Sequence, residues 1–190
     1  MDDTVQCCLQ ILPLNQFHKH KNFKSGKPQF QPLKTFLQQD ALAFQDGCIA
    51  RTYVAVDDNE REDKREPQST FPFTIMGYIT LICSQINLEG YQLGEYSRAE
   101  RYKYLPAVKI ARLAVDSRMR SLGIGNMLFS FALSMVVDNV LPIIGCRFLI
   151  TDAKQEAVDF YHKQGMELLF TDENQSIDNP TMFIDLHTLL

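Results

Sequence analysis

One segment constrains the fold of this chain most. In it, an apolar strand runs directly into a short basic turn and then into a long apolar helix. Residues 111–126 read Ala-Arg-Leu-Ala-Val-Asp-Ser-Arg-Met-Arg-Ser-Leu-Gly-Ile-Gly-Asn. Gly123 and Gly125 open the helix, where glycine permits close backbone approach and the first-turn N–H groups have no partner within the helix. The helix dipole and the side chains of Arg118 and Arg120 favour negative charge there. The segment therefore predicts an anion site suited to a diphosphate.

Two other glycine-rich nucleotide motifs fit this segment poorly. A GxGxxG motif requires a third glycine at position 128, which is Leu128. A Walker A loop requires Gly-Lys followed by Ser or Thr, and the sequence contains none. A Gly-x-Gly pair alone more often marks a helix start with nothing bound, so the strand and the arginines are what favour a binding site.

Strands alternate with helices in the second half of the chain, after a first half rich in strands. We expect strands at 5–12, 52–56, 73–86, 108–115, 146–151, 167–170 and 182–186, and helices at 32–46, 123–137 and 153–164. Gly47 and Gly165 supply stops for the first and last helices. The pattern is typical of an α/β fold with a mixed central sheet of about six to seven strands flanked by helices.

The composition is that of an ordinary globular protein. With 190 residues, 45% of them hydrophobic, the chain can bury one core, so we expect a single domain over residues 1–190. The net charge of −4 gives no global basic field for nucleic acid. The mixed-charge run Asp57–Glu66 is interpreted as a solvated hairpin loop. The tyrosine-rich segment Asn87–Leu105 fits either a substrate-side loop or packing against a partner subunit.

The cysteines indicate a reducing compartment. Their number, five, is odd, and they show no CxxC or Cys/His ligand spacing. Most lie in apolar segments, where a reduced cysteine behaves as a small hydrophobe, and Cys7 and Cys8 are interpreted as buried strand residues. We expect no signal peptide, and the apolar stretches are far shorter than the ~20 residues that span a bilayer. We therefore expect a cytoplasmic protein with no metal and no membrane segment.

Two motifs resemble the GCN5-related N-acetyltransferase (GNAT) superfamily. Residues 120–125, Arg-Ser-Leu-Gly-Ile-Gly, match its Arg/Gln-x-x-Gly-x-Gly/Ala signature, and the preceding residues 112–116 resemble its fourth strand. Residues 152–165 resemble its Asn/Asp-x-x-Ala-x-x-Phe-Tyr-x-x-x-Gly-Phe helix, with Met166 in place of the last Phe. The two motifs stand in the order and at the separation found in the superfamily, and together they span residues 112–165.

The resemblance implies an acetyl-CoA-dependent N-acetyltransferase. Acetyl would move to a primary amine of a small molecule or peptide by direct attack on the thioester. The backbone of Leu113, Ala114 and Val115 would bind the pantetheine arm. The pyrophosphate would be bound by Arg120, Ser121, Leu122, Gly123, Ile124, Gly125 and Asn126.

The resemblance also assigns a proton donor. Tyr161 would protonate the departing CoA thiolate, and a backbone N–H near Val115 would stabilise the oxyanion. The alternative is that Tyr161 is only a core residue, packed beside Phe160. No base is assigned for the amine: Asp116 and Glu95 are candidates because they lie near the predicted site. His162 should point away from Tyr161, towards the surface.

The first half is similar to the toxin branch of the superfamily, through residues 23–30, 33–37 and 50–56. That branch includes enzymes that acetylate the amino group of aminoacyl-tRNA, which stays open as an alternative function. A stripe of basic residues could serve tRNA: His18 to Lys34, Lys103, Lys109, Arg112, Arg118 and Arg120. A homodimer and an inactive acetyl-CoA-binding interaction module also stay open. The sequence does not reveal the acceptor amine or whether an antitoxin partner exists.

Overall fold

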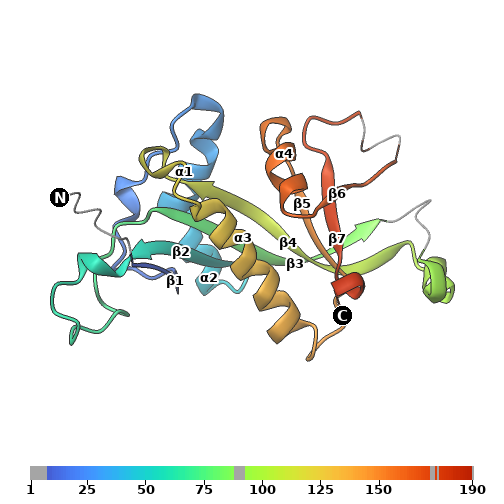
Figure 1. Cartoon of the computed structure of the whole chain (residues 1–190), viewed down its shortest axis with the longest axis horizontal. Helices are drawn as coiled ribbons and strands as arrows, with labels where there is room; N and C mark the ends of the chain where they lie inside the picture. The colour runs from blue at the N-terminus through green and yellow to red at the C-terminus, as the bar shows by residue number, and fades with distance from the viewer. Residues whose placement is uncertain (1–7, 88–92, 172–173, 175, 190) are drawn as a thin grey trace, which may run out of the picture. The chain divides into compact units, whose positions relative to one another are not determined.

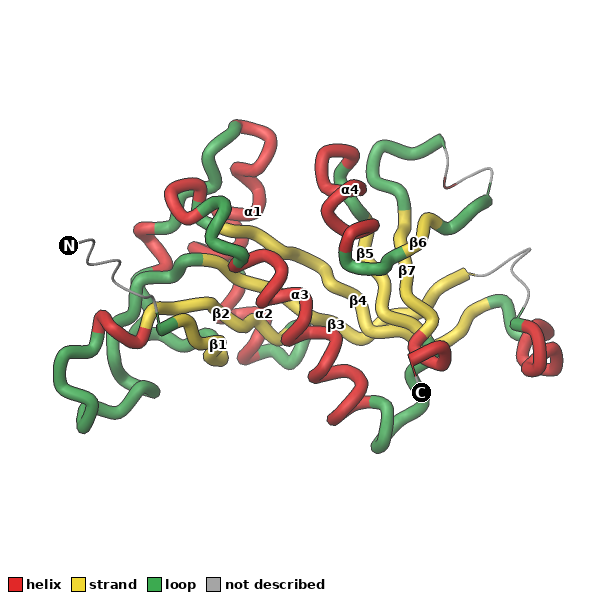
Figure 2. The backbone as a smooth tube through the Cα atoms, viewed as in Figure 1, coloured by secondary structure: helices red, strands yellow, loops and turns green. Residues whose placement is uncertain are grey.

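The structure, a computed structural model, describes residues 8–87, 93–171, 174 and 176–189 and contains one seven-stranded sheet (Figures 1 and 2). The strands are β1 (Leu9–Pro13), β2 (Arg51–Asp57), β3 (Gly77–Asn87), β4 (Tyr104–Val115), β5 (Phe148–Asp152), β6 (Glu167–Leu168) and β7 (Thr181–Asp185), in the order β1-β2-β3-β4-β5-β7-β6. β4 and β5 run parallel, whereas the pairs β1/β2, β5/β7 and β6/β7 are antiparallel. The expected α/β fold with a mixed sheet flanked by helices is confirmed.

The helices are α1 (Gln31–Gln39), α2 (Ala41–Asp46), α3 (Ile124–Met135) and α4 (Gln155–Lys163), with short 3-10 turns between elements. The chain divides into two compact units, the first made of Met1–Thr80 with Arg112–Phe131 and the second of Leu81–Ala111 with Ala132–Leu190. The single domain over residues 1–190 stays a prediction. No helix in the described residues is long and apolar enough to cross a membrane.

The core of the first unit is aromatic. Phe23 packs edge-on against Tyr78, with ring centroids 5.6 Å apart, and Phe36 stacks against the same tyrosine. All three rings are buried. The Tyr78 hydroxyl donates a 2.7 Å hydrogen bond to the carbonyl of Leu33, which ties β3 to α1.

The expectation of a single helix at 32–46 is wrong, because the structure divides this segment at Asp40 into α1 and α2. Asp40 has φ −111°, far from the ideal helical value, and aspartate is a weak helix former. Phe36 and Leu37 of α1 and Ala41 of α2 all enter one core. Burial of these side chains outweighs the continuity of the helix.

The second unit is built on β5 and β7. Phe148 and Phe183 pack edge-on at 5.8 Å within a cluster that also contains Ile86 and Ile150. α4 ends at Lys163, and Gly165 after it breaks the helix as expected: this glycine has φ +85°, and the Met166 N–H donates to the Tyr161 carbonyl at 3.0 Å.

Element ends differ from those expected in several places. β3 starts at Gly77 rather than residue 73, and β4 starts at Tyr104 rather than residue 108. α3 passes into a π-helical turn at Val136–Val140 instead of ending at residue 137. β1 includes Pro13, which an edge strand tolerates. Residues 5–7 of the first expected strand lie outside the described residues.

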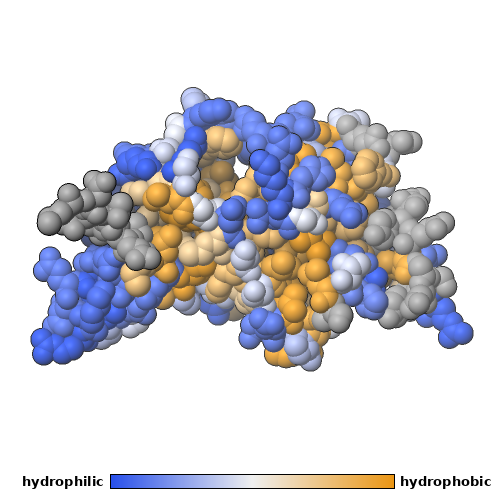
Figure 3. Space-filling model, in the orientation of Figure 1, coloured by the Kyte–Doolittle hydropathy of each residue, from blue (hydrophilic) through white to orange (hydrophobic). Residues whose placement is uncertain are grey.

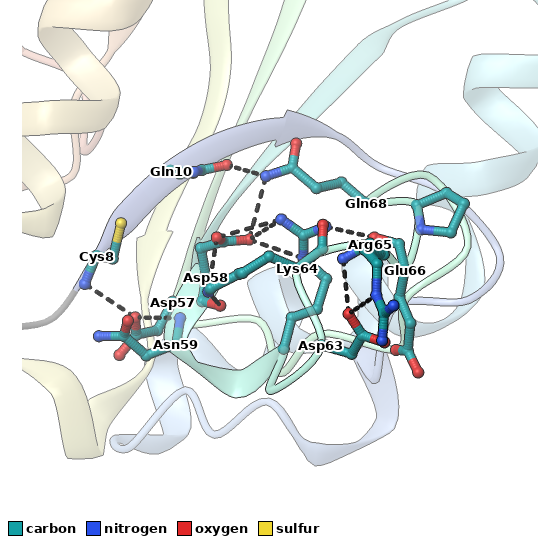
Figure 4. A network of polar contacts seen from close by, with 12 residues as sticks. Cys8, Gln10, Asp57, Asp58, Asn59, Asp63, Lys64, Arg65, Glu66 and Gln68 are labelled. Carbon is teal, nitrogen blue, oxygen red and sulfur yellow. Dashed lines mark hydrogen bonds and ion pairs between the residues drawn. The ribbon is translucent and has the colours of Figure 1, made fainter.

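The segment after β2 is only partly the solvated loop expected of it. Glu62–Pro67 is exposed and forms the hydrophilic corner at the lower left of Figure 3. Asp58 and Arg61, however, are 6% and 9% exposed and form an ion pair of 3.1 Å. Lys64 and Gln68 also donate to the Asp58 carboxylate (Figure 4), and these hydrogen bonds lower its pKa to about 2. The loop is therefore closed by an internal polar network.

The expectation of buried cysteines is wrong for most of the described ones. Cys8, Cys48 and Cys83 are exposed free thiols, and Cys146 is a buried one. Cys8 lies just before β1, where its N–H donates to Asp57 at 2.9 Å and its side chain faces solvent. Cys7 lies outside the described residues.

Candidate functional site

The turn between β4 and α3 is anchored by the carboxylate of Asp116, whose side chain is 0% exposed. Asp116 accepts hydrogen bonds from the N–H of Lys24 at 2.9 Å and from the N–H of Arg118 at 3.0 Å. The Arg118 guanidinium adds two more, and the N–H of Ser117 returns a 2.8 Å bond to the Lys24 carbonyl. The basic segment around Lys24 therefore lies along the turn of the predicted anion site.

Asp116 does not fit the role of general base. Burial by itself would raise the pKa of Asp116, but the hydrogen bonds from Arg118 and from the Lys24 N–H outweigh it and lower the pKa below its usual value. A carboxylate that accepts this many bonds has no reason to take up another proton. These contacts disfavour Asp116 as the base, and its candidacy stays a prediction. The other candidate, Glu95, has a side chain outside the described part of the structure.

The backbone of the turn contains two left-handed residues, and we call residues 120–126, which are predicted to bind the diphosphate, the cradle. Ser121 and Gly123 have φ of +71° and +73°, and both residues are exposed. A left-handed serine is uncommon, and such strain is held in place where the surrounding structure requires it. The Gly123 carbonyl accepts the first helical hydrogen bond, from Met127 at 3.0 Å, so Gly123 caps α3. Nothing lies within 4 Å of a Cβ built on Gly123, which leaves the space over the turn open.

Ile124 holds this turn to the sheet. Its side chain is 1% exposed, whereas Leu122 before it is 51% exposed. A Cβ added to Gly77 of β3 would come within 2.8 Å of Ile124 and 3.1 Å of Leu128. The glycine in β3 thus lets the first turn of α3 approach closely, and the predicted phosphate-binding residues 120–126 start from a rigid base.

Two arginines beside the cradle have different roles. Arg118 is committed to Asp116 and to the Asn22 carbonyl at 3.0 Å. Arg120 is exposed, with one long hydrogen bond of 3.3 Å to the Ser25 carbonyl. Arg120, which is held less tightly than Arg118, is the better placed of the two to meet an anion.

Several residues of the expected basic stripe are buried or contact other side chains of the protein. His18 is 2% exposed, and burial together with the nearby His20 lowers its pKa to about 4, so it is neutral at pH 7. The Arg112 guanidinium lies 3.6 Å from the centre of the Phe36 ring, and Lys109 forms an ion pair with Asp152. Exposed basic residues nevertheless remain in the segment bonded to the cradle turn and in the turn itself: Lys21, Lys24, Lys27 and Arg120.

The predicted pantetheine-binding strand lies at the end of β4. The parallel ladder between β4 and β5 runs from Ala107 to Ile110, so it ends before Leu113. Ala114 is 9% exposed and belongs to the core of the first unit, whereas Leu113 and Val115 point to the other face and are half-buried. The pantetheine role of residues 113–115 stays a prediction.

Tyr161 is 6% exposed on α4, and its hydroxyl is hydrogen-bonded to Thr151 of β5. The Thr151 hydroxyl donates in turn to the Ile110 carbonyl at 3.0 Å. Burial raises the pKa of Tyr161, so the phenol keeps its proton at neutral pH, as a proton donor must. Phe160 packs edge-on at 5.1 Å, and His162 is exposed, as expected.

Sequence reasoning missed Thr151 and a cavity. Thr151 lies at the end of an apolar strand, where no motif marks it. The cavity, of about 580 Å³, lies in the second unit and is lined by Gln85, Ile86, Asn87, Tyr104, Lys109, Ile150, Asp152, Leu169, Thr171, Asn174, Ile177 and Thr181. Tyr104 comes from the tyrosine-rich segment, which favours the substrate-side interpretation of that segment. Residues 88–92 of the tyrosine-rich segment lie outside the described residues.

No protein-family profile matches the chain, but several solved structures do. A structure described as AtaT complexed with acetyl-methionyl-tRNAfMet matches at TM-score 0.75 and 21% identity, over 95% of this chain and 96% of the other. A tyrosine-to-phenylalanine mutant of KacT matches at TM-score 0.77 and 22% identity, over 97% and 98%. AtaTR bound with AcCoA matches at TM-score 0.69 and 21% identity, over 95% of both chains. These similarities show that the chain has the fold that the resemblance implied.

Proposed function

We propose that this chain is an acetyl-CoA-dependent N-acetyltransferase of the toxin type, which acetylates the amino group of aminoacyl-tRNA. The observation that carries the proposal is the open cradle at Ser121 and Gly123, fixed by buried Asp116 and Ile124 and preceded by Arg120. Backbone N–H groups at a helix start, with a nearby guanidinium, bind a diphosphate well. Acetyl-CoA supplies that diphosphate and an activated acetyl thioester.

Tyr161 supplies the proton for the leaving thiolate. Its raised pKa keeps it protonated, and Thr151 holds its hydroxyl in one position. These features disfavour the inactive interaction module, which has no need of a positioned proton donor.

An α-amine suits this site better than a lysine-like amine, which is one of the small-molecule or peptide amines expected first. An α-amino group has a pKa near 8, so about a tenth of it is neutral at pH 7, against about 0.04% of a lysine-like amine. The acceptor must be neutral to attack, and the carboxylate of Asp116, the described candidate for a base, is already occupied by hydrogen bonds from Lys24 and Arg118. The full-length similarity to AtaT complexed with acetyl-methionyl-tRNAfMet supports the aminoacyl-tRNA function in the same direction.

The basic segment supports an RNA partner. Lys21, Lys24 and Lys27 are exposed, and the main chain of Lys24 is bonded to the cradle turn through both its N–H and its carbonyl. Three exposed ammonium groups on a fixed backbone suit contact with phosphates.

An antitoxin is a further proposed partner. AtaT has been solved bound to the C-terminus of the antitoxin AtaR, at TM-score 0.69 to this chain, and a KacTA–DNA complex matches at the same score. By this likeness we expect a protein partner that blocks the activity. The homodimer stays a prediction.

The test is acetylation of charged tRNA. The protein is incubated with acetyl-CoA and a mixture of aminoacyl-tRNAs, uncharged tRNA and free primary amines, and thiol release and acetylated products are measured. Acetylation of the charged tRNA alone is expected. Transfer to free amines in preference to charged tRNA would restore the small-amine function, and binding of acetyl-CoA with no transfer would favour the interaction module.

A further inference from the structure

Arg112 is a half-buried arginine with no carboxylate partner among the described residues. Of the other arginines that are not exposed, Arg61 pairs with Asp58 at 3.1 Å. Arg147 likewise donates to Asp185 at 2.7 Å. In the part of the chain that the structure describes, the Arg112 guanidinium forms neither an ion pair nor a hydrogen bond with the protein. Its charge is therefore left for another partner.

The guanidinium of Arg112 is held by its flat face. Its central carbon lies 3.6 Å from the centre of the Phe36 ring, which is 3% exposed. Phe36 stacks in turn against buried Tyr78, with ring centroids 6.5 Å apart. Stacking fixes the orientation of a guanidinium and leaves the N–H donors in its plane available. Since withdrawing a cation from water without a counterion costs free energy, this arrangement suits an anion.

Arg112 comes directly before the residues predicted to bind the pantetheine arm. The parallel ladder between β4 and β5 ends at Ile110, before this position. Arg112 and Ala114 point to the face on which the core of the first unit lies, and Leu113 and Val115 point to the other. At a rise of roughly 3.3 Å per residue, Arg112 lies within about 10 Å of Val115 along the strand. The sugar and amino acid that separate an aminoacyl amine from its nearest phosphate span a length of this order.

Helix α1 connects this guanidinium to the basic segment. Phe36 of α1 stacks on Arg112, and Gln38 of the same helix donates a 2.9 Å hydrogen bond to the Lys21 carbonyl. Gln38 also donates to the His20 carbonyl at 3.3 Å, and the side chain of Lys21 is exposed. The arginine is thus attached, through one helix, to the backbone that carries the lysines proposed to contact RNA phosphates.

We propose that Arg112 binds the backbone phosphate next to the aminoacylated nucleotide, at the single-stranded 3′ end of the acceptor tRNA. A planar guanidinium binds a phosphate through two parallel N–H···O bonds, which fix both position and orientation. Arg112 touches the acceptor away from the reacting atoms, so it binds and positions the substrate and takes no part in proton transfer. The proposal rests on the proposed function and deepens it by assigning a substrate-binding residue.

The experiment combines a change in the protein with a change in the RNA. Binding of charged tRNA is measured for the unaltered protein and for Arg112→Gln, with one neutral methylphosphonate linkage placed at each position of the 3′ end in turn. The linkage next to the aminoacylated nucleotide should weaken binding to the unaltered protein by about tenfold. It should have no further effect on Arg112→Gln, because the two changes remove the two halves of one contact.

The kinetics and the salt dependence of Arg112→Gln give a second readout. With unmodified charged tRNA, its kcat/KM should fall by at least about tenfold, while its affinity for acetyl-CoA should stay unchanged. The slope of log K against log salt should fall by about 0.7, the value for one phosphate contact on a single strand. A loss of acetyl-CoA affinity would instead assign Arg112 to a phosphate of CoA and overturn the proposal.

Two comparison variants separate charge from geometry. Arg112→Lys keeps the charge but loses the planar fork, so it should keep the salt slope and recover only part of the affinity. Arg51 is an exposed arginine of β2 in the same unit, and Arg51→Gln should behave as the unaltered protein. Thermal melts check that each variant folds.

The outcomes against the phosphate contact differ from those against the proposed function. Additive effects of Arg112→Gln and of every neutral linkage, with acetylation intact, would overturn the contact and leave the proposed function standing. If Arg112→Gln does not fold, the unaltered protein decides alone, because no loss of binding at any linkage would overturn the contact. Absence of acetylation of every charged tRNA by the unaltered protein would overturn both.

Discussion

The Asp116 carboxylate and the Arg118 guanidinium are joined by two side-chain hydrogen bonds, of 2.9 Å from Nε to Oδ1 and 2.7 Å from Nη2 to Oδ2. The same carboxylate binds the N–H of Lys24, from a segment far away in the sequence. The pair therefore fixes the cradle turn and the basic segment together. We expect the pair to position the predicted anion site rather than to exchange protons.

Asp116→Asn should weaken acetyl-CoA binding. The change removes the charge that holds Arg118 and leaves a buried amide in its place, so we expect a loss of about tenfold in affinity, or roughly 1.4 kcal/mol. Calorimetry measures it, with exposed Asp138→Asn as control. An unaltered affinity together with a shifted pH profile of kcat would instead identify Asp116 as the base.

Tyr161→Phe should lower kcat by about 10²-fold or more and leave acetyl-CoA affinity nearly unchanged, because it removes a proton donor and little volume. The raised pKa of Tyr161 means that the donor is lost only above its ordinary value near 10, so the activity should not fall on this account between pH 7 and pH 10. Steady-state kinetics across pH measure both. His162→Ala, at an exposed neighbour, should behave as the unaltered protein; full activity of Tyr161→Phe would return Tyr161 to a packing role.

Gly123→Glu should abolish acetyl-CoA binding while the protein stays folded. The added carboxylate would occupy the open space over the cradle and repel the diphosphate, and the φ of +73° adds a strain of about 1 kcal/mol. Gly145→Glu is the control, at a glycine that also has open space but no left-handed backbone. Thermal melts with and without acetyl-CoA report both folding and binding, and a ligand-induced rise in Tm for Gly123→Glu would refute the cradle.

Replacing Lys21, Lys24 and Lys27 together by Ala should weaken tRNA binding and flatten its salt dependence. Each phosphate contact contributes about 0.7–0.9 to the slope of log K against log salt, so the slope should fall by about 2–3. Filter binding at several salt concentrations measures it. Lys64→Ala, in the loop after β2, should leave the slope as it is, whereas an unchanged slope in the triple variant would place the RNA on another surface.

The sequence predicted the features that short patterns encode. Gly165 marks the end of α4 because the chain needs a left-handed backbone there, which glycine adopts readily. Gly123 marks the start of α3 and has a left-handed backbone too. Long-range contacts were not predictable in the same way. The division at Asp40 depends on how Phe36 and Ala41 share one core, and the capture of Asp116 depends on the main chain of a distant segment.

Side-chain partners decided which charged residues are available. His18 belonged to the predicted basic stripe, yet it is buried and its lowered pKa leaves it neutral. Asp58 belonged to a predicted solvated loop, yet it is the centre of a closed network. A count of charged residues along the sequence does not reveal which of them are buried or paired. The cavity escaped prediction because its lining comes from strands and loops spread over the whole second unit.

The most direct test of the aminoacyl-tRNA function is mass spectrometry of the aminoacyl-adenosine released by nuclease from charged tRNA, after incubation with the protein and acetyl-CoA. We predict an added acetyl group on the α-amine, formed by the unaltered protein and lost with Gly123→Glu. An unmodified α-amine in the presence of bound acetyl-CoA would contradict this function.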